Sequence, residues 1–246
     1  MALLLGFLIA FAIGVTGVGA GTVTAPLLIL FLGLPPEVAV GTALLFGFLV
    51  KVPAGGGYLL RGQVDSGALR RLLLGGVPGV LLGSLLLTGL KGAKELVLLL
   101  VGLTVILSAG LGLWRSLRRV SEGRERPWLI PPAAFGIGLE VGFSSAGAGA
   151  LGTLLLLYAT RLSPQKVVGT DLLFGLVLSL LGGGVHLLFG QVDPGLLLAL
   201  ATGGVLGGAF GALTATRLPK EPFRVALLLW LLFIGAQLAY RGVVHG

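Results

Sequence analysis

The stretch Gly14-Val15-Thr16-Gly17-Val18-Gly19-Ala20-Gly21-Thr22 interrupts an apolar run near the N-terminus. It returns in altered form as Gly142-Phe143-Ser144-Ser145-Ala146-Gly147-Ala148-Gly149. The copies are 128 residues apart, and 23 of 52 ungapped positions are identical between Gly14–Asp65 and Gly142–Asp193. Such agreement at one offset indicates an ancestral unit used twice. We predict two repeats, residues 1–113 and 130–246, joined by a cytoplasmic linker at 114–129.

The composition indicates a helical membrane protein. Of the 246 residues, 56% are hydrophobic and 11% are charged, whereas soluble domains carry about 25% charged residues. Runs such as Leu96–Leu113 and Phe223–Tyr240 reach roughly the 20 residues that a spanning helix needs. The weak alternation of a membrane β-barrel is absent from these Leu-rich runs. The fold class we predict is an all-α, multi-pass membrane protein.

Several functions are disfavoured by what the chain contains. It has no cysteine and two histidines, so we expect no disulfide, cofactor or metal site. The formal charge of +8 comes largely from basic residues in short loops, where orientation signals belong. We therefore expect no nucleic-acid partner. Met1–Ile13 has no basic residue, so we expect it to be retained rather than cleaved as a signal peptide.

Each copy of the glycine-rich stretch divides a pair of segments that are individually too short to cross a membrane. Ala2–Ile13 and Thr22–Leu32 would be about 18 and 16 Å long as helices, against about 30 Å of hydrocarbon. Ile130–Val141 and Ala150–Thr160 repeat this pattern. Each pair is either one broken helix that crosses or a re-entrant pair that returns to the side it entered from.

Three full spans are expected after each pair. In the first repeat they are Val38–Leu60, Gly67–Leu87 and Lys94–Leu113, and in the second they are Lys166–Phe189, Gly195–Ala215 and Phe223–Tyr240.

The loop charges favour re-entrant pairs and inverted repeats. With re-entrant pairs each repeat crosses the membrane an odd number of times, and the basic loop residues divide 13 inside to 3 outside. With simple crossings the division is 9 to 7. Because basic residues accumulate in cytoplasmic loops, we predict inverted topology with both termini outside.

The two breaks are the predicted ligand site. A non-helical backbone is tolerated deep in a bilayer only where it is buried in protein or lines a polar cavity. The second short helix of each pair would present free N–H groups and positive dipole potential at the break. Two such ends meeting at mid-membrane would suit a small anion, as in transporters built from broken helices. Most of the other glycines are expected to be helix-packing residues, among them Gly75-Gly76, Gly79, Gly83, Gly203-Gly204, Gly207-Gly208 and Gly211.

Ionisable residues inside the spans are further candidates, because each is costly in a membrane. Lys51 could attract an anion, snorkel to a headgroup or pair with a carboxylate. Glu140 could carry a proton, pair with Lys51 or repel anions until it is protonated. Asp171 suits proton coupling or an interfacial role, and His186 suits packing or a titrating role. Gln63, Asp65, Gln191 and Asp193 are interpreted as turn-forming residues.

These motifs resemble those of the TauE/SafE sulfite exporters, also called the toluene-sulfonate uptake permeases. The resemblance is carried by Thr16-Gly17-Val18-Gly19-Ala20-Gly21 followed by Pro26-Leu27-Leu28, by Ala39-Val40-Gly41-Thr42-Ala43-Leu44 and by Gly62-Gln63-Val64-Asp65. It covers nearly the whole chain, although the second copy has Leu154 in place of Pro26. It implies a transporter in the bacterial inner membrane for sulfite, sulfonates or related sulfur oxyanions, often working outward.

Our sequence prediction is therefore a secondary transporter without enzyme activity. An anion channel of similar architecture is the alternative, and an intramembrane hydrolase that uses Ser144 or Ser145 with His186 is disfavoured because no orienting acid accompanies them. Proton coupling is assigned as possible to Glu140, Asp171 and His186. The predicted anion-binding residues are Thr16, Gly17, Gly19, Gly21, Thr22, Thr42, Lys51, Ser144, Ser145, Gly147, Gly149 and Thr170.

Overall fold

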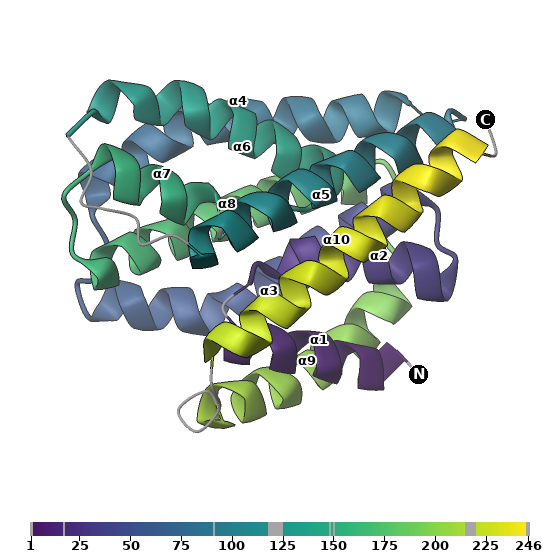
Figure 1. Ribbon diagram of the computed structural model, residues 1–246, viewed down its shortest axis with the longest axis horizontal. Helices are drawn as coiled ribbons and strands as arrows, with labels where there is room; N and C mark the ends of the chain where they lie inside the picture. The colour runs from purple at the N-terminus through teal and green to yellow at the C-terminus, as the bar shows by residue number, and fades with distance from the viewer. Residues whose placement is uncertain are drawn as a thin grey trace.

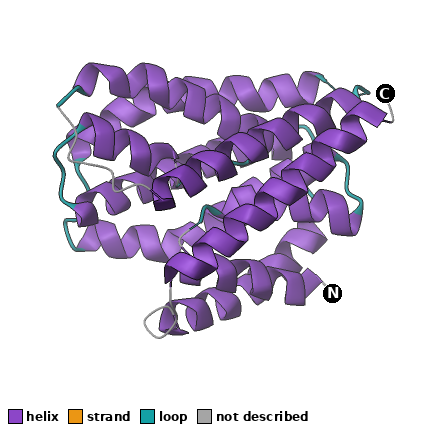
Figure 2. Cartoon of the chain, in the orientation of Figure 1, coloured by secondary structure: helices purple, strands orange, loops and turns teal. Residues whose placement is uncertain are grey.

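The structure is a computed structural model that describes residues 2–16, 18–90, 92–117, 125–147, 149, 151–214 and 220–244. All regular structure in these ranges is helical (Figures 1 and 2). The elements are α1 (Ala2–Thr16), α2 (Ala20–Leu32), α3 (Pro36–Leu60), α4 (Ser66–Gly89), α5 (Lys94–Leu117), η1 (Pro127–Leu129), α6 (Ile130–Ser144), α7 (Leu151–Ala159), α8 (Pro164–Leu188), α9 (Pro194–Thr214) and α10 (Lys220–Val244).

Six of the described helices are long and apolar enough to cross a membrane, and they are the six full spans expected from the sequence: α3, α4, α5, α8, α9 and α10. The all-helical, polytopic class is thereby confirmed. Apart from the single 3-10 turn η1, the remaining described helices α1, α2, α6 and α7 are the short segments around the two breaks. They contain 15, 13, 15 and 9 residues, so the longest measures about 22 Å.

The helix boundaries follow local signals that the two repeats share. Asp65 caps α4, because its Oδ1 accepts a hydrogen bond from the Ala68 N–H at 2.8 Å. Asp193 caps α9 in the same way through the Leu196 N–H at 2.9 Å. Gly62 and Gly190 precede these caps with φ of 64° and 68°, a left-handed conformation that glycine adopts without strain. The prediction that both hairpins carry turn-forming aspartates is confirmed.

Close glycine contacts hold α4 against α6 and α1 against α9. A Cβ at Gly79 would lie 2.2 Å from the Phe135 carbonyl oxygen, and a Cβ at Gly207 would lie 2.1 Å from that of Phe7. Corresponding contacts join Gly75 to Pro131, Gly83 to Leu139, Gly203 to Leu3 and Gly211 to Phe11. Residue numbers rise together along both members of each pair, so the paired helices are parallel. The expected packing role of these glycines is confirmed, except at Gly208, where a Cβ would meet nothing within 4 Å.

The central pair, α3 and α8, runs antiparallel. Gly41 near the start of α3 contacts His186 near the end of α8, and Gly55 contacts Leu173. Helices α5 and α10, which lie side by side in Figure 1, are also antiparallel, since Gly102 contacts Ala239 and Gly112 contacts Leu228.

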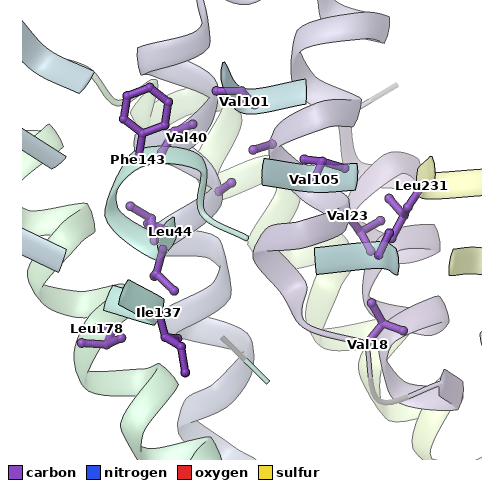
Figure 3. Packing of buried hydrophobic residues seen from close by; sticks show 14 of the residues in the cluster. Val18, Val23, Val40, Leu44, Val101, Val105, Ile137, Phe143, Leu178 and Leu231 are labelled. Carbon is purple, nitrogen blue, oxygen red and sulfur yellow. The ribbon is translucent and has the colours of Figure 1, made fainter. Parts of the chain in front are cut away.

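The apolar core extends through both repeats. Phe46 and Phe174 occupy equivalent positions on α3 and α8, and both are fully buried. Each faces a glycine of the opposite repeat, Phe46 at Gly204 and Phe174 at Gly76. Figure 3 shows another part of this core, where Val23 of α2, Val105 of α5 and Leu231 of α10 lie together. The short helix α2 is therefore enclosed by protein rather than placed at the periphery.

Candidate functional site

The two predicted breaks are real interruptions of the helical chain. In the first repeat α1 ends at Thr16 and α2 begins at Ala20, with Gly19 as its N-cap and no side-chain cap. In the second, α6 ends at Ser144 and α7 begins at Leu151. Ser145, Gly147 and Gly149 between them have φ of 62°, 87° and 108°. Gly17, one of the predicted ligands, lies outside the described residues.

The breaks from the two repeats are in direct contact. A Cβ at Gly21 would lie 1.7 Å from the Ser145 carbonyl oxygen, and a Cβ at Gly149 would lie 3.4 Å from the Gly19 Cα. Glycine is required at Gly21 because the backbone of the other repeat occupies the space of a side chain. The structure therefore brings Gly19, Gly21, Ser145 and Gly149 into one cluster, which we call the break cluster.

The break cluster lies halfway along the central helices. A Cβ at Gly47 would be 3.6 Å from the Ala20 Cβ and 3.8 Å from the Ser179 Oγ. Gly47 is next to the midpoint of the 25-residue helix α3. The N-terminus of α2 is consequently about as far from one end of this spanning helix as from the other.

Hydroxyl groups at the two breaks divide into two kinds. Thr16 donates to the Ala12 carbonyl at 2.6 Å and Ser144 donates to the Glu140 carbonyl at 2.9 Å. These two hydroxyls therefore cap the ends of α1 and α6. Thr22 and Ser145 are buried, each 5% exposed. Within the described part of the chain, no hydrogen bond engages their hydroxyl groups, so both can donate to a ligand.

Thr42 and Thr170 lie elsewhere, where the central helices meet the hairpins of the opposite repeat. The Thr42 Oγ1 accepts a hydrogen bond from the Asp193 N–H at 3.2 Å, and the Thr170 Oγ1 accepts one from the Asp65 N–H at 2.9 Å. The structure thus places these two predicted ligands at the hairpins that precede α9 and α4, not in the break cluster.

Lys51 reaches from α3 to its own repeat equivalent on α8. Its Nζ donates to the Ser179 Oγ at 3.1 Å and to the Gly175 carbonyl at 3.4 Å. Ser179 also neighbours Gly47, which contacts the start of α2. The ammonium group is therefore bonded to a hydroxyl that lies beside Gly47, the residue of α3 that neighbours the start of α2. It is half-buried and also experiences the electrostatic attraction of Asp171.

Asp171 is buried on α8, where its Oδ2 accepts a hydrogen bond from the Thr153 Oγ1 at 2.6 Å. A Cβ at Gly152 would lie 2.0 Å from the other carboxyl oxygen, so that glycine gives the carboxyl its room. Thr153 was missed by the sequence reasoning, because its repeat equivalent is Ala25 and no pattern sets it apart.

Glu140 and His186 lie beside the second break. The Glu140 Oε1 accepts a hydrogen bond from Ser108 of α5. The sequence did not indicate this partner, because Ser108 is a single hydroxyl residue in an apolar run. His186 places Nδ1 2.7 Å from the Gln191 Oε1 and Nε2 3.3 Å from the Gly142 carbonyl oxygen. Gln191, predicted only as a turn residue, is buried and also 3.1 Å from the Thr88 hydroxyl.

Comparison with known proteins identifies relatives along the full length. The chain is 26% identical over 253 aligned residues to the probable membrane transporter protein YjnA of Bacillus subtilis, covering 96% of this chain and 98% of the relative. It is 24% identical to the probable membrane transporter protein YunE of the same organism, covering 92% of each. A probable membrane transporter protein of Xylella fastidiosa is 28% identical, covering 86% of this chain and 83% of that protein.

No solved structure gives a significant match. Residues 2–238 match the family described as Sulfite exporter TauE/SafE, which agrees with the resemblance seen in the motifs. The relatives and the family point to a membrane transporter rather than an enzyme. The chain belongs to the TauE/SafE sulfite exporter family.

Proposed function

We propose that this protein is a secondary transporter that exports small sulfur-containing anions, such as sulfite or organosulfonates, across the bacterial inner membrane. The anion binds at mid-membrane between the two breaks. The observation that carries the proposal is the contact between the breaks halfway along α3, where Gly21 packs on Ser145 and Gly149 on Gly19. An interrupted helix pair from each repeat meeting at mid-membrane is the architecture of many transporter binding sites.

The anion preference follows from the groups at the break cluster. Helix α2 begins there with uncapped N–H groups and the positive end of its dipole. Thr22 and Ser145 supply hydroxyl donors, and Lys51 supplies a positive charge through Ser179. Thr16, Ser144 and Gly147 shape the two turns. Thr42 and Thr170 serve the hairpins instead, because their hydroxyls are engaged by backbone N–H groups.

Inverted topology is part of the proposal. Helices α3 and α8 are equivalent in the two repeats, both are long enough to span, and they run antiparallel. Equivalent spans that cross in opposite directions require the second repeat to be upside down. The repeats are then residues 1–113 and 130–246, the linker 114–129 is cytoplasmic, and movement of one repeat against the other opens the site to each side in turn.

Topology labelling tests the inversion directly. The chain contains no cysteine, so the single variants Pro35→Cys and Ser163→Cys introduce one thiol each at exposed, repeat-equivalent positions. We expect a membrane-impermeant maleimide to label Pro35→Cys in intact cells and Ser163→Cys only after the membrane is opened. Labelling of both variants in intact cells would contradict inverted repeats.

Transport is tested with the purified protein in liposomes. We expect saturable flux of sulfite, thiosulfate or a simple sulfonate, with chloride and acetate as control anions and protein-free liposomes as background. Flux that does not saturate, at rates far above carrier turnover, would favour an anion channel of the same architecture. Absence of flux for every sulfur anion would contradict the proposed function.

A further inference from the structure

The carboxyl group of Glu140 is the feature of the second break that the anion site leaves unexplained. Its side chain is 7% exposed, and its Oε1 accepts a hydrogen bond from the neutral Ser108. Its Oε2 would lie 2.9 Å from a Cβ at Gly147, so the carboxyl touches the turn that packs against the first break. The repeat equivalent of Glu140 is Ala12, and the site therefore has a carboxyl on one side alone.

Three titratable side chains on α3 and α8, helices that pack against α6, have hydrogen-bond partners other than Glu140. Lys51 is bonded to Ser179 and Gly175, Asp171 accepts from Thr153, and His186 contacts Gln191 and the Gly142 carbonyl. No titratable side chain occurs on α2. The other titratable residues on helices packed against α6 are Arg70 and Arg71 on α4, Lys94, Glu95 and Arg115 on α5, Glu37 and Tyr58 on α3, Tyr158 on α7 and Lys166 on α8.

An anion in the break cluster and an ionised Glu140 would repel each other strongly. Both are shielded from water, and the repulsion between like charges is stronger at low dielectric. A protonated carboxyl removes the repulsion and adds a hydrogen-bond donor beside the Gly147 turn. Proton binding and anion binding then favour each other, and this coupling is reciprocal. A bound monovalent anion and one proton together carry no net charge.

We propose that Glu140 must be protonated for the anion to bind, so that one proton and one anion cross the membrane together. This inference rests on the proposed function and identifies the proton as the ion whose movement is coupled to that of the anion. The carboxylate takes up the proton on the side where the anion enters and releases it on the other side with the anion. For a monovalent anion the cycle is electroneutral, so the anion gradient and the pH gradient together set its direction and the membrane potential does not. Export requires an outward anion gradient that exceeds the inward proton gradient.

The test uses methanesulfonate and thiosulfate, neither of which binds protons near neutral pH, with the full-length protein in liposomes. For wild type we expect an inward proton gradient to accelerate anion uptake and a trapped pH dye to report proton entry. With methanesulfonate, a potential set by potassium and valinomycin should leave the rate unchanged. Above the titration range of Glu140, the apparent affinity should fall tenfold per pH unit.

The variant Glu140→Gln keeps a neutral side chain in place of the protonated acid. We expect it to transport methanesulfonate without proton entry, independently of pH, and in response to the membrane potential. The matched control Glu221→Gln removes an exposed carboxyl in the first turn of α10 and should behave as wild type. Should Glu140→Gln not fold, wild type in weakly buffered detergent, at a pH above the titration range of Glu140, should still take up about one proton for each methanesulfonate bound.

The possible results separate the two proposals. Wild-type flux without proton entry, or proton-coupled flux that persists in Glu140→Gln, overturns the coupling inference and leaves the transporter assignment intact. No flux of sulfite, thiosulfate or methanesulfonate by wild type overturns the proposed function, and the inference falls with it. Anion binding to wild type without proton uptake likewise overturns the coupling inference.

Discussion

Replacing Gly21 by alanine should abolish transport while the protein still inserts into the membrane. The added Cβ would lie 1.7 Å from the Ser145 carbonyl oxygen and 2.3 Å from the Ser145 Oγ. The hydroxyl can rotate away, but the carbonyl is backbone and can move only if the two breaks separate. A displacement of 1 Å in a positioned site costs about 100-fold in rate, so we expect a loss of at least about that size in liposome flux.

The matched control for this variant is Gly56→Ala. Gly56 lies on α3, and its Cβ would meet nothing within 4 Å. This variant tests the general effect of replacing a helical glycine without creating a steric clash, and we expect it to show wild-type flux. Flux of Gly21→Ala equal to that of the control, at equal amounts of inserted protein, would refute the assignment of the break cluster as the transport site.

Replacing Gly79 by leucine should destabilise the folded protein. The new Cβ would lie 2.2 Å from the Phe135 carbonyl oxygen and 2.9 Å from the Leu139 N, both of them backbone atoms of α6. Removing this clash would require α4 and α6 to move apart at the interface where Gly75 and Gly83 also contact α6. Overpacking a close-packed contact typically costs about 1–3 kcal/mol, and we expect about 3 kcal/mol here because the clashing atoms belong to the backbone. For a chain of this size that is a fall of roughly 6–12 °C in melting temperature.

The repeat supplies both a replicate and a control for this experiment. Gly207→Leu places its Cβ 2.1 Å from the Phe7 carbonyl oxygen, so we expect a similar fall when thermal unfolding is followed in detergent. Gly208→Leu is the control, because its Cβ meets nothing within 4 Å. Equal melting temperatures for Gly208→Leu and Gly79→Leu would show that the close contact between α4 and α6 is not what limits stability.

Much of the fold could be predicted from local signals in the chain. The expected spans and the observed helices differ by only a few residues at each end, as in Val38–Leu60 against Pro36–Leu60. Two of these signals, the runs of apolar residues and the turn-forming Asp65 and Asp193, act through near neighbours in sequence. The breaks were recognisable for the same reason, since glycines and hydroxyls cluster there twice at one offset.

The candidate site was predicted less completely, because its contacts join residues that are far apart in the chain. Thr42 and Thr170 share the repeat pattern with the breaks, yet their hydroxyls meet backbone groups of the opposite hairpin. Ser108 and Thr153 carry no sequence signal, and they became visible as the partners of Glu140 and Asp171. The sequence marked Gly21 as part of a break without indicating that Ser145 lies against it.

By itself, the sequence determined that this chain is built from two related copies of a helical membrane unit, each with one interrupted pair of short segments. Hydropathy, glycine and repeated spacing suffice for that, because they describe each segment and its immediate neighbours. Only the tertiary structure decided which residues of the two breaks touch, where Lys51 places its ammonium group and which hydroxyl meets Glu140. A polar side chain takes its partner from the helix packed against it, and that choice depends on how all the helices fit together.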